Sequence, residues 1–378
     1  MGLVISLPFK RSGTHSNVKT PDHGGDAWAV SSRLAIPVTS IMDFSASVNP
    51  LGTSTLAAKA IEGGIQSLPF YPDKDCSRLR DAISLYLQDV SSENILVGNG
   101  STEIIHLFSQ VFLERGDEAI VLQPTFSEYE YAIDRNRAKP VASRMRKGFK
   151  LDADALLSRI TPRTKAIFLC NPNNPTSTTH DRNGVEEILE EAAKRKIMVL
   201  LDECFMEFVE DYDHLSFSRE SKDYGNLIVL RSLTKVFGLA GLRVGYAIGS
   251  KKTITHLSNF KVTWSVNTLA QAAGVAALND EDYLKETKRL IRSERAYLNE
   301  SLPKIGVSIT PPKANFILAE LQGQMTAPEL KQRLLTHRIL IRDCSGFRGL
   351  GSRFMRLAVR KREDNLALIQ ALKELLRN

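Results

Sequence analysis

Cysteine is scarce in this chain. Four cysteines occur among 378 residues, at positions 76, 170, 204 and 344, and no two of them form a Cys-x-x-Cys pair. This spacing argues against a zinc site built on cysteines and against a disulfide framework. We therefore expect no metal centre and a reducing, cytoplasmic environment.

Long apolar runs are absent as well. No run approaches the roughly 18 consecutive apolar residues that a membrane-spanning helix needs. The apolar start at Met1–Ser6 is too short for the core of a signal peptide, and Lys10 and Arg11 follow it rather than precede it. The sequence therefore predicts a protein without a membrane partner.

The excess of positive charge is small. Lys and Arg number 50 and Asp and Glu 43, which gives a net charge of +7. Such a surplus permits contact with nucleic acid or membranes, and it equally suits an enzyme for anionic small molecules. The proportions of 43% apolar and 25% charged residues are ordinary for a globular protein. The length predicts two or three domains.

Apolar runs that alternate with helical patterns indicate the fold class. Strands are predicted at residues 95–98, 119–122, 166–170, 198–202 and 227–230, and a helix at 185–193. The runs are continuous, as expected for strands buried on both faces. The sequence therefore predicts an α/β protein with a mostly parallel central sheet and helices on both faces. Ligands of such sheets lie beyond the carboxyl ends of the strands.

The pattern changes after residue 267. A long helical stretch covers about 268–302, and strands are predicted at 314–318, 339–342 and 354–359. A last helix is expected from about Glu363 to Leu376. These elements predict a smaller α+β unit.

Two loops at the predicted strand ends are rich in glycine or asparagine. Residues 98–103 (Gly-Asn-Gly-Ser-Thr-Glu) leave a strand and open a helix, so they could bring backbone N–H groups close to an anion. Ser101 could equally be only a helix cap. Residues 171–176 (Asn-Pro-Asn-Asn-Pro-Thr) follow another strand and could be only a turn.

Charged residues follow two further strands. Asp202 ends an apolar strand, where a carboxylate needs a partner. Lys235 follows the next strand, with Ser232 and Thr234 before it and Arg243 eight residues after it. A lone lysine is usually a solvated surface residue, but this setting could make Lys235 an activated amine.

Taken together, Asn174-Pro175-Thr176, Asp202, Ser232-x-Thr234-Lys235 and Arg243 resemble the pyridoxal-phosphate-dependent aminotransferase superfamily of fold type I. The order and spacing match from about residue 23 to 378. The resemblance implies that Lys235 carries pyridoxal 5'-phosphate as a Schiff base and later moves protons. Asp202 would keep the pyridine nitrogen protonated, which makes the ring an electron sink.

The same resemblance implies the other cofactor contacts. Asn174 would bond the ring hydroxyl, and Phe126 would stack on the ring. The residues expected to hold the cofactor phosphate are Gly100, Ser101, Thr102, Ser232 and Arg243. A dianionic phosphate suits a helix start and an arginine fork. Tyr71 resembles the tyrosine that reaches this phosphate from the other subunit, which implies a homodimer.

Two arginines of the C-terminal unit are candidates for binding substrate. Arg356 matches the arginine that binds the substrate α-carboxylate in this superfamily, although it could also be a surface residue of an edge strand. Arg342 lies where histidinol-phosphate aminotransferases and their relatives approach the distal phosphate. The sequence thus predicts two anion sites for one small molecule.

The N-terminal region narrows the resemblance. His23-Gly24-Gly25, followed by Asp-Phe-Ser-Ala-x-x-Asn-Pro-Leu-Gly at 43–52, is similar to the threonine-phosphate decarboxylases of cobalamin biosynthesis. In that family the segment folds over the active site, with His-Gly-Gly near the substrate phosphate. The alternative is that His23-Gly24-Gly25 belongs to a flexible tail and matches the family by chance. Ser47 departs from the Asn usual in that family, which makes serine phosphate a competing substrate.

The resemblance implies three parts of the chain. They are an N-terminal arm over the active site at residues 1–50, a large cofactor-binding domain at 51–267 and a small C-terminal domain at 268–378.

The sequence therefore predicts a pyridoxal-phosphate-dependent decarboxylase of an O-phosphorylated amino acid in cobalamin biosynthesis. It would convert L-threonine O-3-phosphate to (R)-1-amino-2-propanol O-2-phosphate, or L-serine O-phosphate to ethanolamine phosphate. The closest alternative is an aminotransferase of the histidinol-phosphate type. A further alternative is a non-catalytic cofactor-binding regulator. Regulators with this fold normally carry a separate DNA-binding domain, and the 22 residues at the N-terminus are too few for one, which disfavours this alternative. No nucleic-acid partner is expected.

Overall fold

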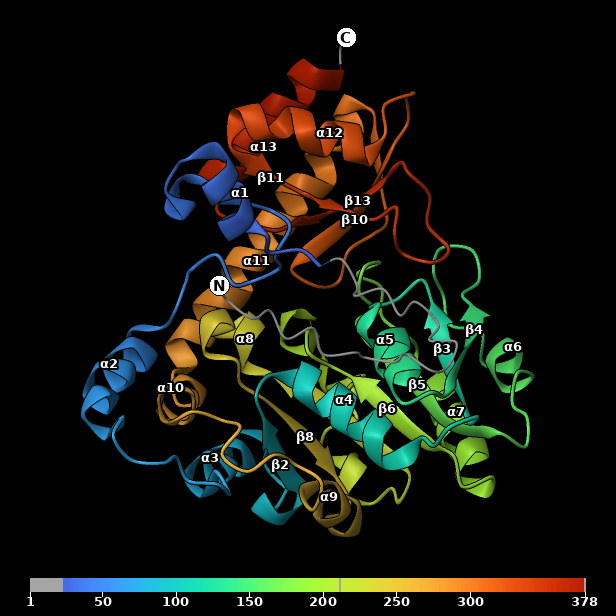
Figure 1. The fold of residues 1–378 in the computed structure, drawn as a ribbon. Coiled ribbons are helices and arrows are strands. Elements are labelled where there is room, and N and C mark those ends of the chain that lie inside the picture. The colour runs from blue at the N-terminus through green and yellow to red at the C-terminus, as the bar shows by residue number, and fades with distance from the viewer. Residues whose placement is uncertain (1–22, 211, 377–378) are drawn as a thin grey trace, which may run out of the picture.

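The computed structural model describes residues 23–210 and 212–376 (Figure 1). A seven-stranded sheet forms its centre, in the order β2-β8-β7-β6-β5-β3-β4. The strands are β2 (Ile95–Gly98), β3 (Glu118–Gln123), β4 (Lys139–Arg144), β5 (Thr164–Cys170), β6 (Met198–Asp202), β7 (Leu227–Ser232) and β8 (Gly245–Gly249). Only β8 runs antiparallel to its two neighbours in this sheet. The predicted mostly parallel sheet is confirmed.

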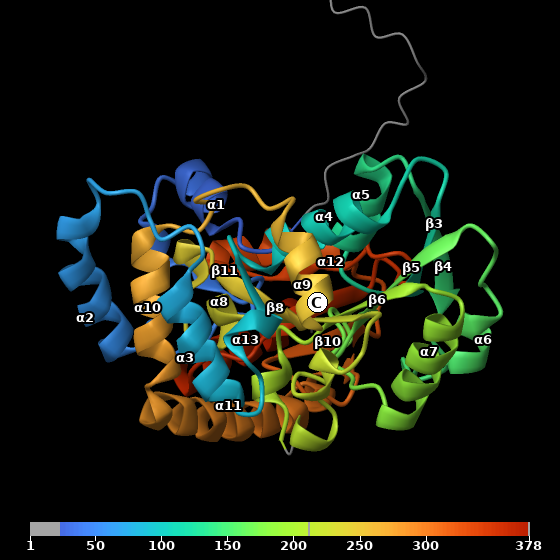
Figure 2. The same ribbon diagram turned by 90° about the horizontal axis from the view of Figure 1, so that it is seen from below.

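Helices cover both faces of this sheet, as Figures 1 and 2 show. They include α3 (Ser77–Leu87), α4 (Ser101–Phe112), α5 (Glu128–Arg135), α6 (Ala153–Leu157), α7 (Arg182–Lys194) and α9 (Lys251–Ser258). The helix α4 packs on β2, β7 and β8, and α7 packs on β6. Because the central strands are enclosed in this way, every residue of β7 is buried, which explains the continuous apolar run of its first four residues.

The sequence analysis did not predict two strands of this sheet, β4 and β8, for opposite reasons. The strand β4 forms an edge of the sheet and carries polar, partly exposed residues. The strand β8 is buried, but glycines at both of its ends shorten its apolar run to three residues. Composition alone therefore did not mark either segment as a strand.

A second sheet lies in the C-terminal part of the chain, shown orange to red in Figure 1. It has four antiparallel strands in the order β12-β13-β10-β9. The elements here are β9 (Val307–Ile309), β10 (Phe316–Leu321), β12 (Arg342–Asp343), β13 (Phe354–Ala358), α12 (Ala327–Leu334) and α13 (Arg362–Leu376). This agrees with the smaller α+β unit that the sequence predicts.

The predicted strand at 339–342 is divided between two sheets. Its first half, β11 (Ile339–Leu340), pairs in parallel with β1 (Met42–Asp43), whereas β12 begins at Arg342. Beside this pair, Val30 of α1 (Ala27–Leu34) packs with Leu335 and Leu340 in a separate apolar cluster. The described part of the N-terminal region is therefore attached to the C-terminal unit. Residues 1–22 of the predicted arm lie outside the described residues.

The helical stretch at 268–302 is broken once. The helix α10 (Thr268–Leu278) ends before Asp280, whose side chain caps α11 (Glu281–Ser301) by accepting a hydrogen bond from the Tyr283 N–H. The helix α10 packs against α2 (Thr55–Gly64) and α3. The boundary predicted at 267 stays a prediction. Within residues 23–210 and 212–376, no helix is long and apolar enough to cross a membrane.

Candidate active site

A cavity of about 390 Å³ opens beyond the carboxyl ends of the central strands. It collects twelve of the sixteen residues predicted for the site, namely His23, Gly24, Ser47, Ser101, Thr102, Phe126, Asn174, Asp202, Lys235, Arg243, Arg342 and Arg356. Gly25, Tyr71, Gly100 and Ser232 do not line it. The cavity is therefore lined by the loops after β2, β3, β5, β6 and β7, and by residues of the segments 23–47 and 342–356.

One wall of the cavity is the start of α4. Gly100 precedes the helix with a φ of +78°, and a Cβ placed on it would lie 2.6 Å from Nη2 of Arg243. The guanidinium therefore lies directly against a residue that must be glycine. Among the described residues the N-cap of α4 is Gly100 and no side chain caps the helix, so the interpretation of Ser101 as only a cap is wrong. The first N–H groups of a helix have no acceptor within it, and together with Arg243 they form a cradle that fits a phosphate.

Lys235 lies in the short helix α8 (Leu233–Val236), directly after β7. Ser232 caps this helix, and its hydroxyl lies 2.7 Å from Oγ1 of Thr234. Burial lowers the pKa of Lys235 to about 8, with a further contribution from the positive charges of Arg356 and Arg243. A substantial fraction of this amine is therefore neutral near physiological pH, as a nucleophilic amine requires.

Asp202 is buried at the end of β6 and both of its oxygens accept hydrogen bonds. Oδ2 accepts from the hydroxyl of Tyr129 at 2.7 Å, and Oδ1 accepts from the Cys204 N–H at 2.9 Å. Burial raises the pKa of Tyr129, as does the charge of Asp202, so the phenol keeps its proton. These two contacts hold the carboxylate in one orientation. The sequence analysis missed Tyr129, for which the only signal was its place three residues after Phe126.

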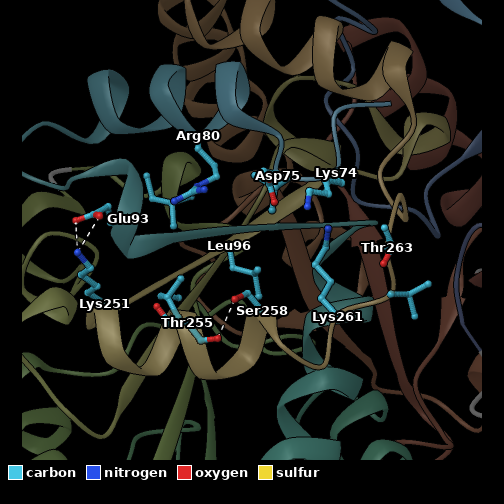
Figure 3. Close-up of a pocket in the computed structure, with 14 residues that line it drawn as sticks. Lys74, Asp75, Arg80, Glu93, Leu96, Lys251, Thr255, Ser258, Lys261 and Thr263 are labelled. Atoms are coloured by element: carbon cyan, nitrogen blue, oxygen red, sulfur yellow. Dashed lines mark hydrogen bonds and ion pairs between the residues drawn. The ribbon is translucent and has the colours of Figure 1, made fainter. Parts of the chain in front are cut away.

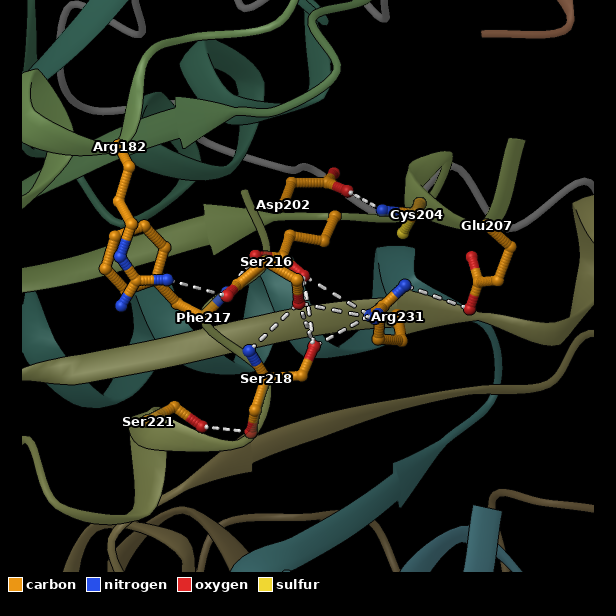
Figure 4. Close-up of polar contacts among 10 residues, drawn as sticks. Arg182, Asp202, Cys204, Glu207, Ser216, Phe217, Ser218, Ser221 and Arg231 are labelled. Carbon is orange, nitrogen blue, oxygen red and sulfur yellow. Dashed lines mark hydrogen bonds and ion pairs between the residues drawn. The ribbon is translucent and has the colours of Figure 1, made fainter. Parts of the chain in front are cut away.

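Beneath the strand ends, a buried ion pair joins β6 to β7 (Figure 4). Arg231 precedes Ser232, and Glu203 follows Asp202. Nε of Arg231 lies 3.4 Å from Oε2 of Glu203, and its Nη1 lies 3.0 Å from Oε1 of Glu207. All three charged side chains are almost fully buried. The pair therefore links the backbone segments that carry Asp202 and Lys235.

The loop after residue 212 completes this buried cluster. Three of its groups donate hydrogen bonds to the carboxylate of Glu203, namely the Ser216 hydroxyl at 2.6 Å, the Phe217 N–H at 2.8 Å and the Ser218 hydroxyl at 3.0 Å. Burial raises the pKa of Glu203, opposed by the charge of Arg231 and by these bonds. A buried carboxylate this well satisfied can hold the backbone segments around it in one geometry.

The opposite wall of the cavity carries two arginines. Arg342 of β12 and Arg356 of β13 stand opposite each other in the antiparallel register. Arg356 is only 7% exposed, so the alternative of a surface arginine is wrong. Burial lowers the pKa of Arg356 to about 10, helped by the charge of Arg342. Two buried cations on neighbouring strands favour an anionic ligand.

Arg356 also fastens two other segments to this wall. Its Nη2 donates a hydrogen bond to the Ser45 carbonyl at 2.7 Å, and its Nη1 donates to Oδ1 of Asn174. Its Nε has no hydrogen-bond partner within the described part of the chain. The predicted carboxylate-binding residue and the predicted ring-binding residue, Asn174, are thus direct neighbours.

The N-terminal glycines lie against this arginine. A Cβ on Gly24 would lie 2.2 Å from the Ser45 carbonyl oxygen and 3.4 Å from Nη2 of Arg356, so no larger residue fits there. Gly25, with a φ of +92°, donates its N–H to the Ser45 hydroxyl at 2.8 Å. Ser47 is buried in the cavity wall, and its hydroxyl has no hydrogen-bond partner among the described residues. Gly24 and Ser47 therefore face the cavity, while the amide of Gly25 is already engaged.

Tyr71 lies away from the cavity lining. Its side chain is 79% exposed, and its ring stacks on that of Trp264 with 4.6 Å between the ring centroids. Phe70 and Val262 are also largely exposed. These residues give the chain exposed apolar side chains near Tyr71, which is unusual for a surface that faces only water.

A second cavity, also of about 390 Å³, contains none of the predicted site residues (Figure 3). Its charged lining residues are Lys74, Asp75, Arg80, Glu93, Lys251 and Lys261. Lys251 and Glu93 form an ion pair at 2.8 Å. No group of His, Cys, Asp and Glu able to hold a metal ion occurs among residues 23–210 and 212–376.

Comparison with known sequences agrees with this geometry. Residues 39–372 match the family described as aminotransferase class I and II. A protein of Caldanaerobacter subterraneus with a provisional threonine-phosphate decarboxylase name is 38% identical over 331 residues, which are 87% of this chain and 88% of that protein. A histidinol-phosphate aminotransferase of Methanosphaera stadtmanae is 33% identical, over 95% of this chain and 97% of its own length.

The fold also matches a solved structure. Histidinol-phosphate aminotransferase from Sinorhizobium meliloti, in complex with pyridoxal 5'-phosphate, has a TM-score of 0.86 with 22% identity and covers 98% of both chains. The buried Asp202, the lysine of lowered pKa and the cradle of Gly100 and Arg243 fit that cofactor. The chain belongs to the aminotransferase class I and II family, has fold type I, and uses pyridoxal 5'-phosphate as its cofactor.

Proposed function

We propose that this protein decarboxylates an O-phosphorylated amino acid, with L-threonine O-3-phosphate as the leading substrate and L-serine O-phosphate as the competitor. One observation carries the proposal. Arg342 and Arg356, paired across two strands, bring two positive charges into the cavity that also contains Lys235. A substrate with a carboxylate and a phosphate would match both charges. The relative that shares 38% of the aligned residues has a name of the same reaction class.

The cofactor end would work as follows. When bound, pyridoxal 5'-phosphate supplies a ring that accepts the electrons left at the substrate Cα. Asp202 keeps a proton on the ring nitrogen, and Tyr129 keeps the carboxylate of Asp202 in place through their 2.7 Å hydrogen bond. Arg243 and the start of α4 hold the cofactor phosphate, with Ser232 beside them.

The residues at the substrate end of the cavity would determine which bond at the substrate Cα breaks. Arg356 orients the α-carboxylate, and Arg342 binds the distal phosphate, so the Cα–carboxylate bond is held in one direction. The carboxylate leaves as CO2, and Lys235 delivers a proton to Cα. The product is 1-amino-2-propanol phosphate or ethanolamine phosphate, and the first of these places the enzyme in cobalamin biosynthesis.

Transfer of an amino group is the second candidate, because a relative named histidinol-phosphate aminotransferase aligns over 95% of this chain. Both reactions need the same cofactor end, so a direct assay separates them. The purified protein is incubated with threonine phosphate, and CO2 is measured. It is then incubated with histidinol phosphate and 2-oxoglutarate, and glutamate is measured. We expect CO2 release. Glutamate formation without CO2 would instead establish the aminotransferase.

We also propose that the protein is a cytoplasmic homodimer in which Tyr71 reaches the partner subunit's cofactor. The exposed side chains of Phe70, Tyr71, Val262 and Trp264 support this. Mixing two inactive variants, Tyr71→Ala and Lys235→Ala, tests it. In a dimer with shared sites the mixture regains activity, because one site of the mixed dimer combines an intact Lys235 with an intact Tyr71. Failure of the mixture to regain activity, with a monomer found by analytical ultracentrifugation, would overturn this proposal.

A further inference from the structure

Glu128 has a position in the cavity that the proposed mechanism does not use. It lies in the first turn of α5, and its side chain is only 7% exposed. Its Oε1 is hydrogen-bonded to Nε2 of His23 at 2.7 Å, and its Oε2 to Nε2 of His106 at 2.9 Å. His106 belongs to α4, whereas His23 belongs to the N-terminal segment. The carboxylate therefore ties that segment to the large sheet's helices.

The charge state of Glu128 decides what its partners do. Burial alone would raise the pKa of Glu128, but the hydrogen bonds from His106 and His23 outweigh burial and lower the pKa to about 2. The carboxylate is therefore ionised at neutral pH, and an ionised carboxylate can only accept hydrogen bonds. Both histidines must then donate from Nε2.

This arrangement leaves Nδ1 of His23 as the ring nitrogen that Glu128 does not use. In a neutral ring that donates from Nε2, Nδ1 carries a lone pair and would repel a phosphate. In the charged imidazolium, Nδ1 is a donor. The other charged residues that line this cavity are Asp202, Lys235, Arg243, Arg342 and Arg356.

Packing fixes the place of the ring. The ring centroid of His23 lies 5.5 Å from that of Phe126. The next residue, Gly24, is held between Ser45 and Arg356, since a Cβ there would meet both. His23 is thus kept beside the wall that carries the two arginines, and both residues line the same cavity.

We propose that Glu128 is a positioning residue that sets specificity for a phosphorylated substrate. It holds His23 at the cavity through the hydrogen bond to Nε2, so that Nδ1 of the imidazolium form is the nitrogen left to donate to the distal phosphate, and His106 holds the other carboxylate oxygen. The two imidazoles also offset the negative charge of Glu128, which would otherwise repel a dianion. This inference rests on the proposed function, because it assumes that the substrate carries a phosphate.

The test is Glu128→Gln in the cofactor-loaded enzyme, with binding of O-phospho-L-threonine and of L-threonine measured separately. The amide has the size of the carboxylate but only one accepting oxygen for two imidazole N–H groups, so it cannot hold both rings in place. We expect the dissociation constant of the phosphorylated ligand to rise about 10- to 100-fold, while that of L-threonine changes less than about threefold. The KM for threonine phosphate should rise with it, and kcat and the affinity for the cofactor should change little. His106→Asn should have the same effect, but smaller.

Two controls keep the result interpretable. Glu130→Gln changes a carboxylate of the same helix that pairs with Arg348, and it should leave both ligands unaffected. His23→Asn combined with Glu128→Gln should be no worse than His23→Asn alone, because both changes remove one donor. Equal losses for the phosphorylated and the unphosphorylated ligand would overturn the inference, as would an unchanged affinity for both. If the wild-type protein releases no CO2, the proposed reaction fails, yet these binding measurements still decide the role of Glu128.

Discussion

The cavity has two ends that are built in different ways. The cofactor end comes from residues 98–243, and its groups lie at or shortly after the carboxyl ends of strands of one hydrogen-bonded sheet, except for Arg243, which lies just before β8. The substrate end comes from residues 23–47 and 342–356, which are brought together by contacts such as the pairing of β1 with β11 and the hydrogen bond from Arg356 to the Ser45 carbonyl. One end is therefore fixed by local chain order and the other by contacts between the two termini.

Because the two ends are built differently, we expect substitutions to impair one end without impairing the other. A change at a strand end of the sheet should alter cofactor binding and chemistry. A change where the termini meet should alter substrate affinity while the cofactor stays bound. The following predictions test that separation, beginning with the largest effect.

Lys235→Ala should lower kcat by at least about 10³-fold, because it removes both the attachment point of the cofactor and the group that moves the proton. The absorbance of the bound cofactor should change at the same time. The measurement is CO2 release together with the absorption spectrum. Lys285→Ala, which alters an exposed lysine of α11, serves as the control and should match the wild type. Activity that persists in Lys235→Ala would remove the lysine from the mechanism.

Arg231→Met should lower the free energy of unfolding by about 3–5 kcal/mol, because it leaves the buried carboxylates of Glu203 and Glu207 without their partner. Urea unfolding checks this value. A companion variant, Arg182→Met, alters an arginine whose ion pairs with Glu186 and Glu220 are partly exposed, and should cost about 1 kcal/mol or less. Equal losses of unfolding free energy in the two variants would show that the buried cluster around Arg231 contributes no more to stability than a partly exposed ion pair.

A pair of glycine substitutions compares the two ends directly. Gly100→Ala places a Cβ 2.6 Å from Arg243 and should weaken cofactor binding about tenfold or more. Gly24→Ala places one 2.2 Å from the Ser45 carbonyl and should raise the substrate KM by a similar factor with unchanged cofactor affinity. Cofactor titration and steady-state kinetics measure the two effects. If both variants lose cofactor, the two ends are not separable.

The pH dependence of cofactor incorporation tests the environment of Lys235. Its pKa is lowered to about 8 from the ordinary 10.5, so the reactive neutral amine is already the main form above pH 8. In cofactor-free protein, the rate of incorporation should rise about tenfold between pH 7 and pH 9 and then level off. An amine with an ordinary pKa would give a rate that keeps rising to pH 10, and such a result would contradict the predicted burial effect.

Tyr129→Phe should have the smallest effect. It removes one hydrogen bond to Asp202 and leaves the Cys204 N–H in place, so kcat should fall about two- to tenfold. Phe108→Leu alters a buried ring that packs on Phe168 without touching Asp202, and it should lower stability but not kcat. A loss in Tyr129→Phe as large as that of Asp202→Asn would mean that the hydroxyl acts on the substrate itself.

How much the sequence could predict differs between the two ends as well. Asn174 and Lys235 could be placed because each follows a recognisable strand, and Asp202 because it ends one, since parallel strands bring their carboxyl ends together. Arg243 could be placed by its spacing from Lys235. Glu128, His106 and Tyr129 could not, because they lie on helices, and helical spacing does not say what faces a helix across the cavity. The split of residues 339–342 between β11 and β12 was hidden too, since one apolar run can supply two sheets.

The sequence by itself determined the family, the cofactor and five of the seven strands of the central sheet, because apolar runs and the residues that follow them are local properties of the chain. The tertiary structure decided which residues form the substrate end of the cavity. It paired Arg342 with Arg356, closed Gly24 against Ser45 and joined His23 to Glu128 across 105 positions of sequence. Those contacts depend on how segments far apart in the sequence pack against each other, and packing is a property of the whole molecule rather than of any segment.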